Sequence, residues 1–169
     1  MATESAQTIT IRIPIAFDLE GRQLIAEDIL EFIRNRTERG LDKNNNSFAR
    51  YSDSYVESID FKIAGKSKNQ VDLELSGDMM SALDIIDIRT AGFITIGYQR
   101  SEENDKAAWQ RNNLRPSFPK RDFLGITDKD LNKIISRYTY LLDEQVREES
   151  KKRSRIQEEA SRILSRIRF

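Results

Sequence analysis

Cysteine and histidine are both absent from this chain of 169 residues. The lack of cysteine excludes disulfide bonds, thiolate zinc sites and cysteine nucleophiles. The lack of histidine removes the commonest general base and the commonest ligand of transition metals, which leaves carboxylates, lysine, tyrosine and serine for any chemistry. An enzymatic role is therefore not expected.

Excess charge of one sign and long apolar runs are also lacking. Lys+Arg (28) and Asp+Glu (28) cancel, so the whole chain has no field that could hold nucleic acid by counterion release, and any DNA contact must come from a local patch. No apolar run approaches the ~20 residues of a membrane span, and the first residues lack a basic segment followed by an apolar core. These features predict a protein that is made and used in the cytosol.

The length fits one compact body with extensions. Isoleucine at every second position from Ile9 to Ile15 predicts a strand over 8–15 with one buried face, and Pro14 places it at a sheet edge because proline cannot donate to a ladder. Apolar residues at helical spacing predict a long first helix over 19–39, which Gly40 ends. The sequence also predicts short strands over 56–63, 71–75, 85–89 and 93–98, and a short helix from Ser76 through Leu83.

The C-terminal third predicts an irregular segment and then one long helix. Residues 99–118 are polar, with a short helix expected around Ala107-Ala108-Trp109, and so long a loop is expected to become ordered on assembly. Thr127 to Asp130 resembles a capping box, and no proline or glycine follows, so the helix is expected to run to the C-terminus. Its middle over 143–155 is almost free of apolar residues, but an apolar stripe returns near the end and needs a partner. The stripe comprises Ile156, Ala160, Ile163, Leu164 and Ile167.

Together these elements predict an α+β fold, with a small antiparallel sheet packed against one long N-terminal helix and a long projecting C-terminal helix. A single domain is expected over 1–140 and a helical arm over 141–169. The charged run from Glu148 to Arg153 is expected to be a solvated helix face, because mixed charges three and four residues apart support a helix without any ligand.

Some acidic and aromatic patterns resemble chemical sites. Asp42 opens a run like a calcium loop that would close at Asp53, but Ser47 stands where that loop needs glycine, so a surface turn is expected. The alternating acids over 72–76 resemble a strand of a metal-dependent nuclease, but serine ends the run where a lysine would be needed. The aromatic pair of the segment 51–55 is expected to pin a loop onto the core rather than to be modified.

Three separate segments carry turn and anchor motifs. The first is GLDKNNNSFARYSDSY over 40–55, the second is VDLELSGDMM over 71–80 with ITIG over 94–97, and the third is Pro119-x-Arg121-x-Phe123-Leu124-Gly125. In order and spacing they resemble the phage virion morphogenesis family, the tail-completion or neck proteins of tailed bacteriophages. The chain departs from that family at Asn45, where glycine is usual, and at Ala49, where proline is common. Asparagine tolerates the left-handed conformation, so the turn can survive.

The resemblance implies a structural protein without catalysis, metal or cofactor. Its copies would form a homo-oligomeric ring, of six or else twelve subunits, in the neck of the virion. Portal or head-closure proteins would lie on one side and tail tube or terminator proteins on the other, and genome DNA would pass through the lumen. Such a protein is made in the host cytoplasm and has no contact with a membrane.

Two other functions compete with that of a neck protein. One is a cytosolic binding module that dimerises through its helical arm and contacts nucleic acid with residues 151–155, and the other is a hydrolase that depends on Asp72 or Glu74.

The expected site residues fall into two sets, anchors of the fold and interface residues. Arg121 is expected in a buried or interfacial hydrogen-bonded pair. The expected fold and loop anchors are Phe48, Tyr51, Tyr55, Phe123, Leu124 and Gly125, and the expected interface residues are Arg121, Trp109, Phe118, Ile156, Ile163, Leu164 and Ile167.

Overall fold

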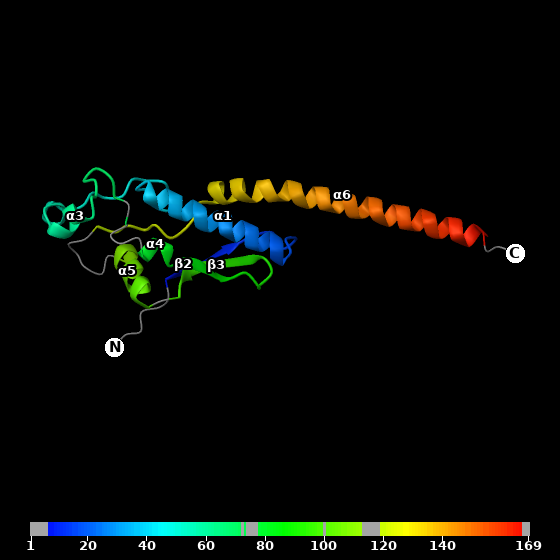
Figure 1. Ribbon diagram of the computed structural model, residues 1–169, viewed down its shortest axis with the longest axis horizontal. Helices are drawn as coiled ribbons and strands as arrows, with labels where there is room; N and C mark the ends of the chain where they lie inside the picture. Colours follow the sequence, from blue (N-terminus) through cyan, green and yellow to red (C-terminus); the bar gives the residue numbers. More distant parts are fainter. Residues whose placement is uncertain (1–6, 72, 74–77, 100, 113–118, 167–169) are drawn as a thin grey trace. The chain divides into compact units, whose positions relative to one another are not determined.

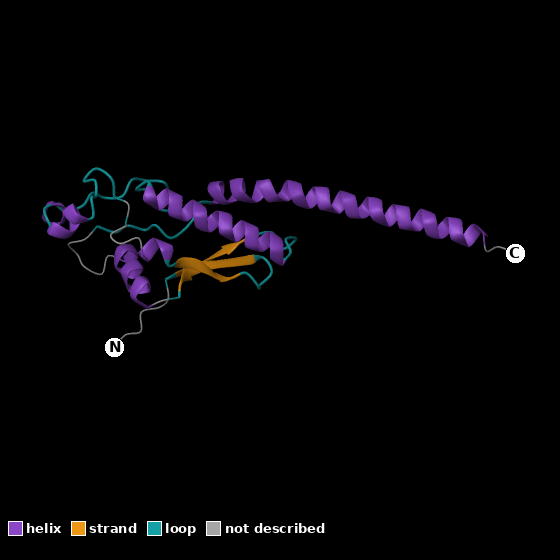
Figure 2. Cartoon of the chain, in the orientation of Figure 1, coloured by secondary structure: helices purple, strands orange, loops and turns teal. Residues whose placement is uncertain are grey.

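The computed structural model describes residues 7–71, 73, 78–99, 101–112 and 119–166. These residues confirm the α+β fold class, because they form a three-stranded antiparallel sheet, a long N-terminal helix and a long C-terminal helix (Figure 1). The chain divides into two compact units, residues 1–134 and residues 135–169, and each is described by itself. The sheet and the first long helix belong to the first unit; Figure 2 shows its strands in orange and its helices in purple.

The sheet has the order β1-β3-β2. β3 (Phe93–Tyr98) therefore lies between β1 (Thr8–Arg12) and β2 (Leu83–Asp87), and it runs antiparallel to both. The expected edge position of β1 is confirmed, and β2 is the second edge of the sheet. β3 has the bounds predicted for the strand 93–98. β2 was predicted over 85–89 but is observed two residues earlier, over 83–87.

Isoleucine side chains supply the buried face of the sheet. Ile11 of β1 lies opposite Ile94 of β3, and both are buried. The expectation that Ile15 extends this face is wrong, because its side chain is 72% exposed. The strand ends at Arg12, and the following residues turn toward the first helix.

Helix α1 (Leu19–Glu38) contacts β2 and β3 through its apolar face. Asp18 caps the helix, since its Oδ1 accepts a hydrogen bond from the backbone N–H of Gly21 at 2.8 Å. Gly40 adopts φ +79° directly after the helix, where a side chain would be strained, so the predicted stop is confirmed. The buried apolar residues of α1 are Ile25, Ala26, Ile29, Leu30 and Ile33.

The predicted strand over 56–63 is wrong. Two short helices, α2 (Asp53–Val56) and α3 (Ile59–Ile63), stand there instead. Ser58 explains the second one, because its side-chain oxygen accepts from the N–H of Phe61 at 3.2 Å and caps the helix. Of the predicted strand 71–75, residues 71 and 73 lie in no strand, and the others are outside the described residues.

The predicted irregular segment 99–118 is wrong over most of its length. Helix α5 (Ser101–Asn112) occupies residues 101–112 and contains the short helix expected around Ala107-Ala108-Trp109. The short helix α4 (Asp78–Ser81) lies earlier in the chain, before β2. Acidic residues in the first turn of α5 and Arg111 in its last turn complement the helix dipole. Ala107 and Ala108 are buried, so α5 has an apolar side that is only two small residues wide, too narrow for a periodic signal.

Helix α6 (Asp128–Arg166) has 39 residues, which corresponds to about 58 Å. Thr127 caps it by accepting from the N–H of Asp130 at 3.2 Å, as the sequence predicts. Its first turns, through Ile134, belong to the first unit, and the remainder forms the second. Within the described residues, no helix is both long and apolar enough to span a membrane.

Candidate functional site

Two of the three motif segments, far apart in the sequence, contact each other in the first unit. The backbone N–H of Lys43 donates to the carbonyl of Asp122 at 2.8 Å. Arg121 donates from Nε and Nη2 to the carbonyl of Ala49 at 3.3 and 3.2 Å, and from Nη2 to that of Arg50 at 3.2 Å. We call this contact region the motif junction; it comprises Arg36, residues 40–51 and residues 119–126.

Arg121 is the centre of the motif junction and is 5% exposed. Besides the two loop carbonyls, its Nη1 donates to Oε1 of Gln110 at 3.3 Å, which connects the junction to α5. Its guanidinium carbon lies 5.4 Å from the ring centroid of Tyr51, a cation–π arrangement. Burial lowers the pKa of Arg121, against an opposing effect of Tyr51 and Tyr55. All of these contacts lie within one chain.

Arg36 is a second buried guanidinium, at 0% exposure, and the sequence did not single it out. It reaches from α1 to the carbonyl of Phe123 and to that of Lys43, the latter at 3.3 Å. Burial lowers the pKa of Arg36 to about 10, although Asp42, Asp130 and Asp122 oppose the change, so the side chain is charged at neutral pH. The available signal was its position three residues after Ile33, on the apolar face of α1.

Asp122 makes ion pairs that connect its own segment to the loop 40–51 and to α5. Its Oδ2 lies 2.8 Å from Nζ of Lys43, and its Oδ1 lies 3.2 Å from Nε of Arg111 on α5. Burial disfavours the charged carboxylate, but the hydrogen bonds from Lys43 and Arg111 outweigh it, so the pKa of Asp122 is lowered. Arg111 also donates to Oε1 of Gln7 at 2.9 Å, which extends the network to the start of β1.

The expected anchors surround these charges. Phe48, Phe123 and Leu124 are buried, at 8%, 0% and 1% exposure. Gly125 has φ +158°, and a Cβ at this position would lie 3.1 Å from the side chain of Lys43. A larger residue here would therefore require the Lys43 side chain to shift by a few tenths of an ångström.

Tyr51 and Tyr55 are half-buried and form an aromatic cluster with Phe61. The ring centroids lie 5.2 Å apart for Tyr51 and Tyr55, 5.5 Å for Tyr51 and Phe61, and 5.3 Å for Tyr55 and Phe61. Two of these pairs are edge-to-face, the arrangement that ring quadrupoles favour. The cluster packs α2 and α3 against the loop that leads into them.

The Asp42 turn is held by its own carboxylate. Oδ1 of Asp42 accepts from the N–H groups of Asn44 and Asn46, each at 2.8 Å, and Asn45 adopts φ 65°. The departure from glycine at position 45 is thus accommodated in the left-handed conformation. The Asn45 side chain donates to Oδ2 of Asp130 at 2.9 Å, so the turn is attached to the start of α6.

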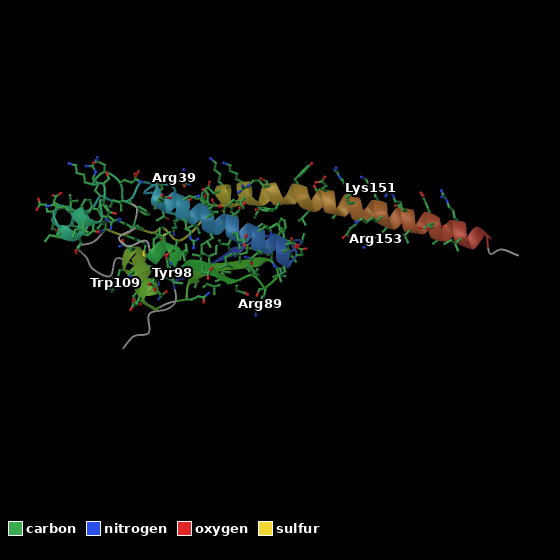
Figure 3. All side chains as sticks on the ribbon, viewed as in Figure 1. Arg39, Arg89, Tyr98, Trp109, Lys151 and Arg153 are labelled. Carbon is green, nitrogen blue, oxygen red and sulfur yellow. The ribbon has the colours of Figure 1, made fainter. Side chains whose placement is uncertain are left out.

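Of the expected interface residues, Arg121 lies in the motif junction and the others lie elsewhere in the chain. Trp109, on α5, is 53% exposed (Figure 3), and Ile156 and Ile163, on α6, are 67% and 53% exposed. Phe118 and Ile167 lie outside the described residues, as does the side chain of Leu164.

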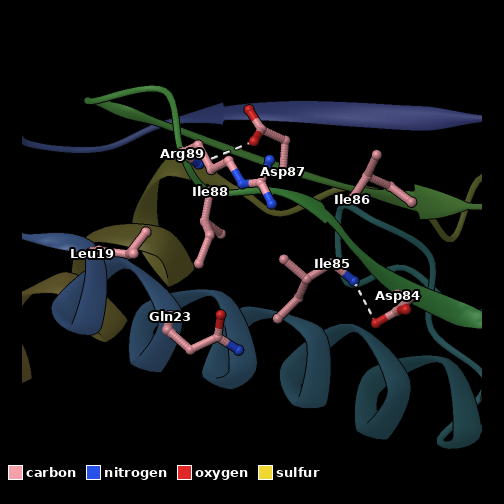
Figure 4. A pocket seen from close by; sticks show the side chains of 8 residues that line it. All are labelled: Leu19, Gln23, Asp84, Ile85, Ile86, Asp87, Ile88 and Arg89. Carbon is pink, nitrogen blue, oxygen red and sulfur yellow. Dashed lines mark hydrogen bonds between the residues drawn. The ribbon is translucent and has the colours of Figure 1, made fainter.

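A shallow cavity of about 510 Å³ lies between α1 and β2 (Figure 4). Leu19 and Gln23 line it from the helix, and Ile85 and Ile88 point toward them from the strand side (Figure 4). Asp84, also in the lining, accepts the N–H of Ile85 at 2.8 Å. Within the described ranges, no group of three acidic side chains is placed to hold a metal ion.

Compared with known proteins, the chain matches no protein-family model, no curated protein and no solved structure. Its function has to be inferred from the chain's own residues and geometry. The motif junction uses both guanidinium groups and Asp122 to hold loops together, an arrangement that fixes shape and presents surface.

Proposed function

We propose that this protein is a structural component of the neck of a tailed bacteriophage, a tail-completion protein without catalytic activity. The observation that supports the proposal is that the first and third segments of the resemblance contact each other through Arg121 and Asp122. These two share one set of hydrogen bonds, as parts of a single structural motif would.

In this proposal, copies form a six-fold ring through which genome DNA passes. Exposed apolar side chains of the first unit, Ile59 at 73%, Ile63 at 80% and Trp109 at 53%, are suited to contacts between neighbouring copies. The zero formal net charge suits a channel that must not grip passing DNA. Head-closure or portal proteins and tail proteins are the neighbours on the two sides.

The test uses the phage or prophage that encodes the chain. Disruption of the gene is expected to give filled heads and separate tails instead of infectious particles, and the protein is expected in purified wild-type virions by mass spectrometry. Purified protein should form rings in negative-stain electron micrographs as its concentration rises. An unchanged infectious titre after disruption would exclude the neck function.

The competing binding module keeps one supporting observation, the exposed basic run of α6 from Lys151 to Arg155. A gel-shift assay at moderate salt separates the two functions, because a regulator binds DNA and the proposed ring protein does not. Replacement of Lys152 and Arg153 by glutamate would abolish the shift if that run made the contact, since each such residue neutralises about one phosphate.

A further inference from the structure

The second unit carries one narrow stripe along α6. At about 100° per residue, positions 135, 138, 142, 145, 149, 153, 156, 160 and 163 all lie within about 40° of position 149 around the helix. The stripe is apolar at both ends and polar in its middle, where Glu149 and Arg153 stand. Lys151, two residues from Glu149, points to a different side of α6 from Arg153 (Figure 3).

The spacing of the stripe is the same in both directions from Glu149. In an antiparallel pair of helices with a two-fold axis at that residue, positions equally far before and after it face each other. Ile135 would face Ile163 of the second copy, and Leu142 would face Ile156. The large Tyr138 would face the small Ala160, so the side-chain sizes also match.

The charges of α6 select the same orientation. Residues 143–149 contain four acidic side chains and one arginine, whereas residues 151–155 contain four basic side chains and no acid. An antiparallel pair centred on Glu149 places each acidic segment beside the basic segment of the other copy, with Arg153 of one copy one turn from Glu149 of the other. A parallel pair in register would place like charges together at both segments.

The C-terminal end of the stripe is exposed, whereas Ile135, Tyr138 and Leu142 at its other end are half-buried. Ile156 and Ile163 are 67% and 53% exposed, and Ala160 between them is also exposed. They form a continuous apolar face three and four residues apart, which a single helix in water leaves uncovered. We propose that α6 of two copies of this chain pair antiparallel about a two-fold axis at Glu149. This pairing goes beyond the neck function and does not depend on it, because it uses only residues of α6.

Engineered cysteines in the full-length chain test this register, since the natural chain has none to interfere. Glu149→Cys alone is expected to form a disulfide-linked dimer under mild oxidation, because only the residue at the axis meets its own copy. Ala160→Cys alone should stay monomeric on a non-reducing gel. A mixture of Ala160→Cys with tagged Tyr138→Cys should give the mixed dimer. Lys151→Cys, on the far side of the helix, is the matched control and should remain unlinked.

Each alternative pattern of cross-linking overturns the proposal. Linking of Ala160→Cys to itself as readily as Glu149→Cys indicates a parallel pair. Equal linking of Lys151→Cys indicates random collision. A monomer in sedimentation equilibrium at tens of micromolar, with no mixed dimer, indicates that the stripe is covered by something other than a second copy. Circular dichroism of each variant, expected to match that of the wild type, shows whether α6 is intact.

Discussion

Single arginine side chains donate hydrogen bonds to several backbone carbonyls of the loops in the motif junction. A guanidinium has five N–H donors in a fixed fork, so it can bind several carbonyls of a segment that lacks a helix or sheet partner. Arg121 serves the carbonyls of Ala49 and Arg50, and Arg36 serves those of Phe123 and Lys43. Because a buried charge is costly unless it is well paired, the stability of the protein is expected to depend on the hydrogen-bond geometry of both guanidinium groups.

Arg121→Ala is expected to destabilise the protein by roughly 3 kcal/mol, because it removes a buried side chain and its hydrogen bonds to the carbonyls of Ala49 and Arg50. Arg121→Lys should recover less than half of this loss, since an ammonium cannot reproduce the fork. Urea denaturation of each variant measures the effect. Arg50→Ala is the matched control, an exposed arginine of the same loop whose loss is expected to change stability by less than about 0.5 kcal/mol. Equal effects of the two alanine variants would contradict the role of Arg121.

Asp122 makes stability depend on acid pH. Its pKa is lowered in the folded state, so its contribution is present above the pKa of the unfolded carboxyl and is lost as pH falls through the folded value. Asp122→Asn should therefore lower the melting temperature at pH 7 by several degrees, and the difference from wild type should disappear at an acid pH below the folded pKa of Asp122. Asp143→Asn, an exposed carboxylate on α6, is the control. A difference that is the same at both pH values would count against the ion pairs with Lys43 and Arg111.

At the scale of elements, strong periodicity made the fold predictable. Alternating isoleucines gave β1 and β3, and the 3.6-residue repeat gave α1 and α6. α2 and α3 were missed because they are four or five residues long and depend on serine caps or aromatic packing. α5 was expected only as a short helix around residues 107–109, because it buries only a narrow side. Arg36 was missed because a charged residue on a helix usually lies in solvent, whereas here loop carbonyls surround it.

Gly97 of β3 lies opposite Thr8, at the start of β1. A Cβ there would lie 2.6 Å from the carbonyl oxygen of Gln7 and 2.6 Å from Cγ2 of Thr8. Gly97→Ala is expected to cost about 2–3 kcal/mol and to speed hydrogen exchange of β1 amides, because the strand must move away. Gly65→Ala is the comparison, since its φ of +62° is strained but nothing lies within 4 Å of its Cβ, so it should cost about 1 kcal/mol. Unchanged protection of β1 in Gly97→Ala would disprove the clash.

At the scale of the whole molecule, the first unit is expected to fold without most of α6. A chain that ends at Asp143 keeps Thr127, Asp130 and Ile134, the residues that attach the start of α6 to the body. It should be a soluble monomer with a cooperative thermal transition within a few degrees of that of the full chain, and the proposed neck function predicts that it fails to enter virions. Loss of the transition would show that the body does not fold without the arm. Normal incorporation would show that the arm is not needed for assembly.

The contacts of Arg36 also bear on the order in which the chain folds while it is being synthesised. One acceptor of its guanidinium, the carbonyl of Phe123, follows 87 residues later in the sequence. At a synthesis rate of 5–20 residues per second, this is a delay of roughly 4–17 s. Until then Arg36 has the Lys43 carbonyl but lacks its second acceptor, so the nascent body is expected to close only after Phe123 arrives. By the time Phe123 has left the exit tunnel, much of α6 is being threaded through it, which makes that helix the tether on which the body completes its folding. Force measurements with arrest peptides should show tension only after that point, and Arg36→Met should advance it; tension before Phe123 emerges would refute this order.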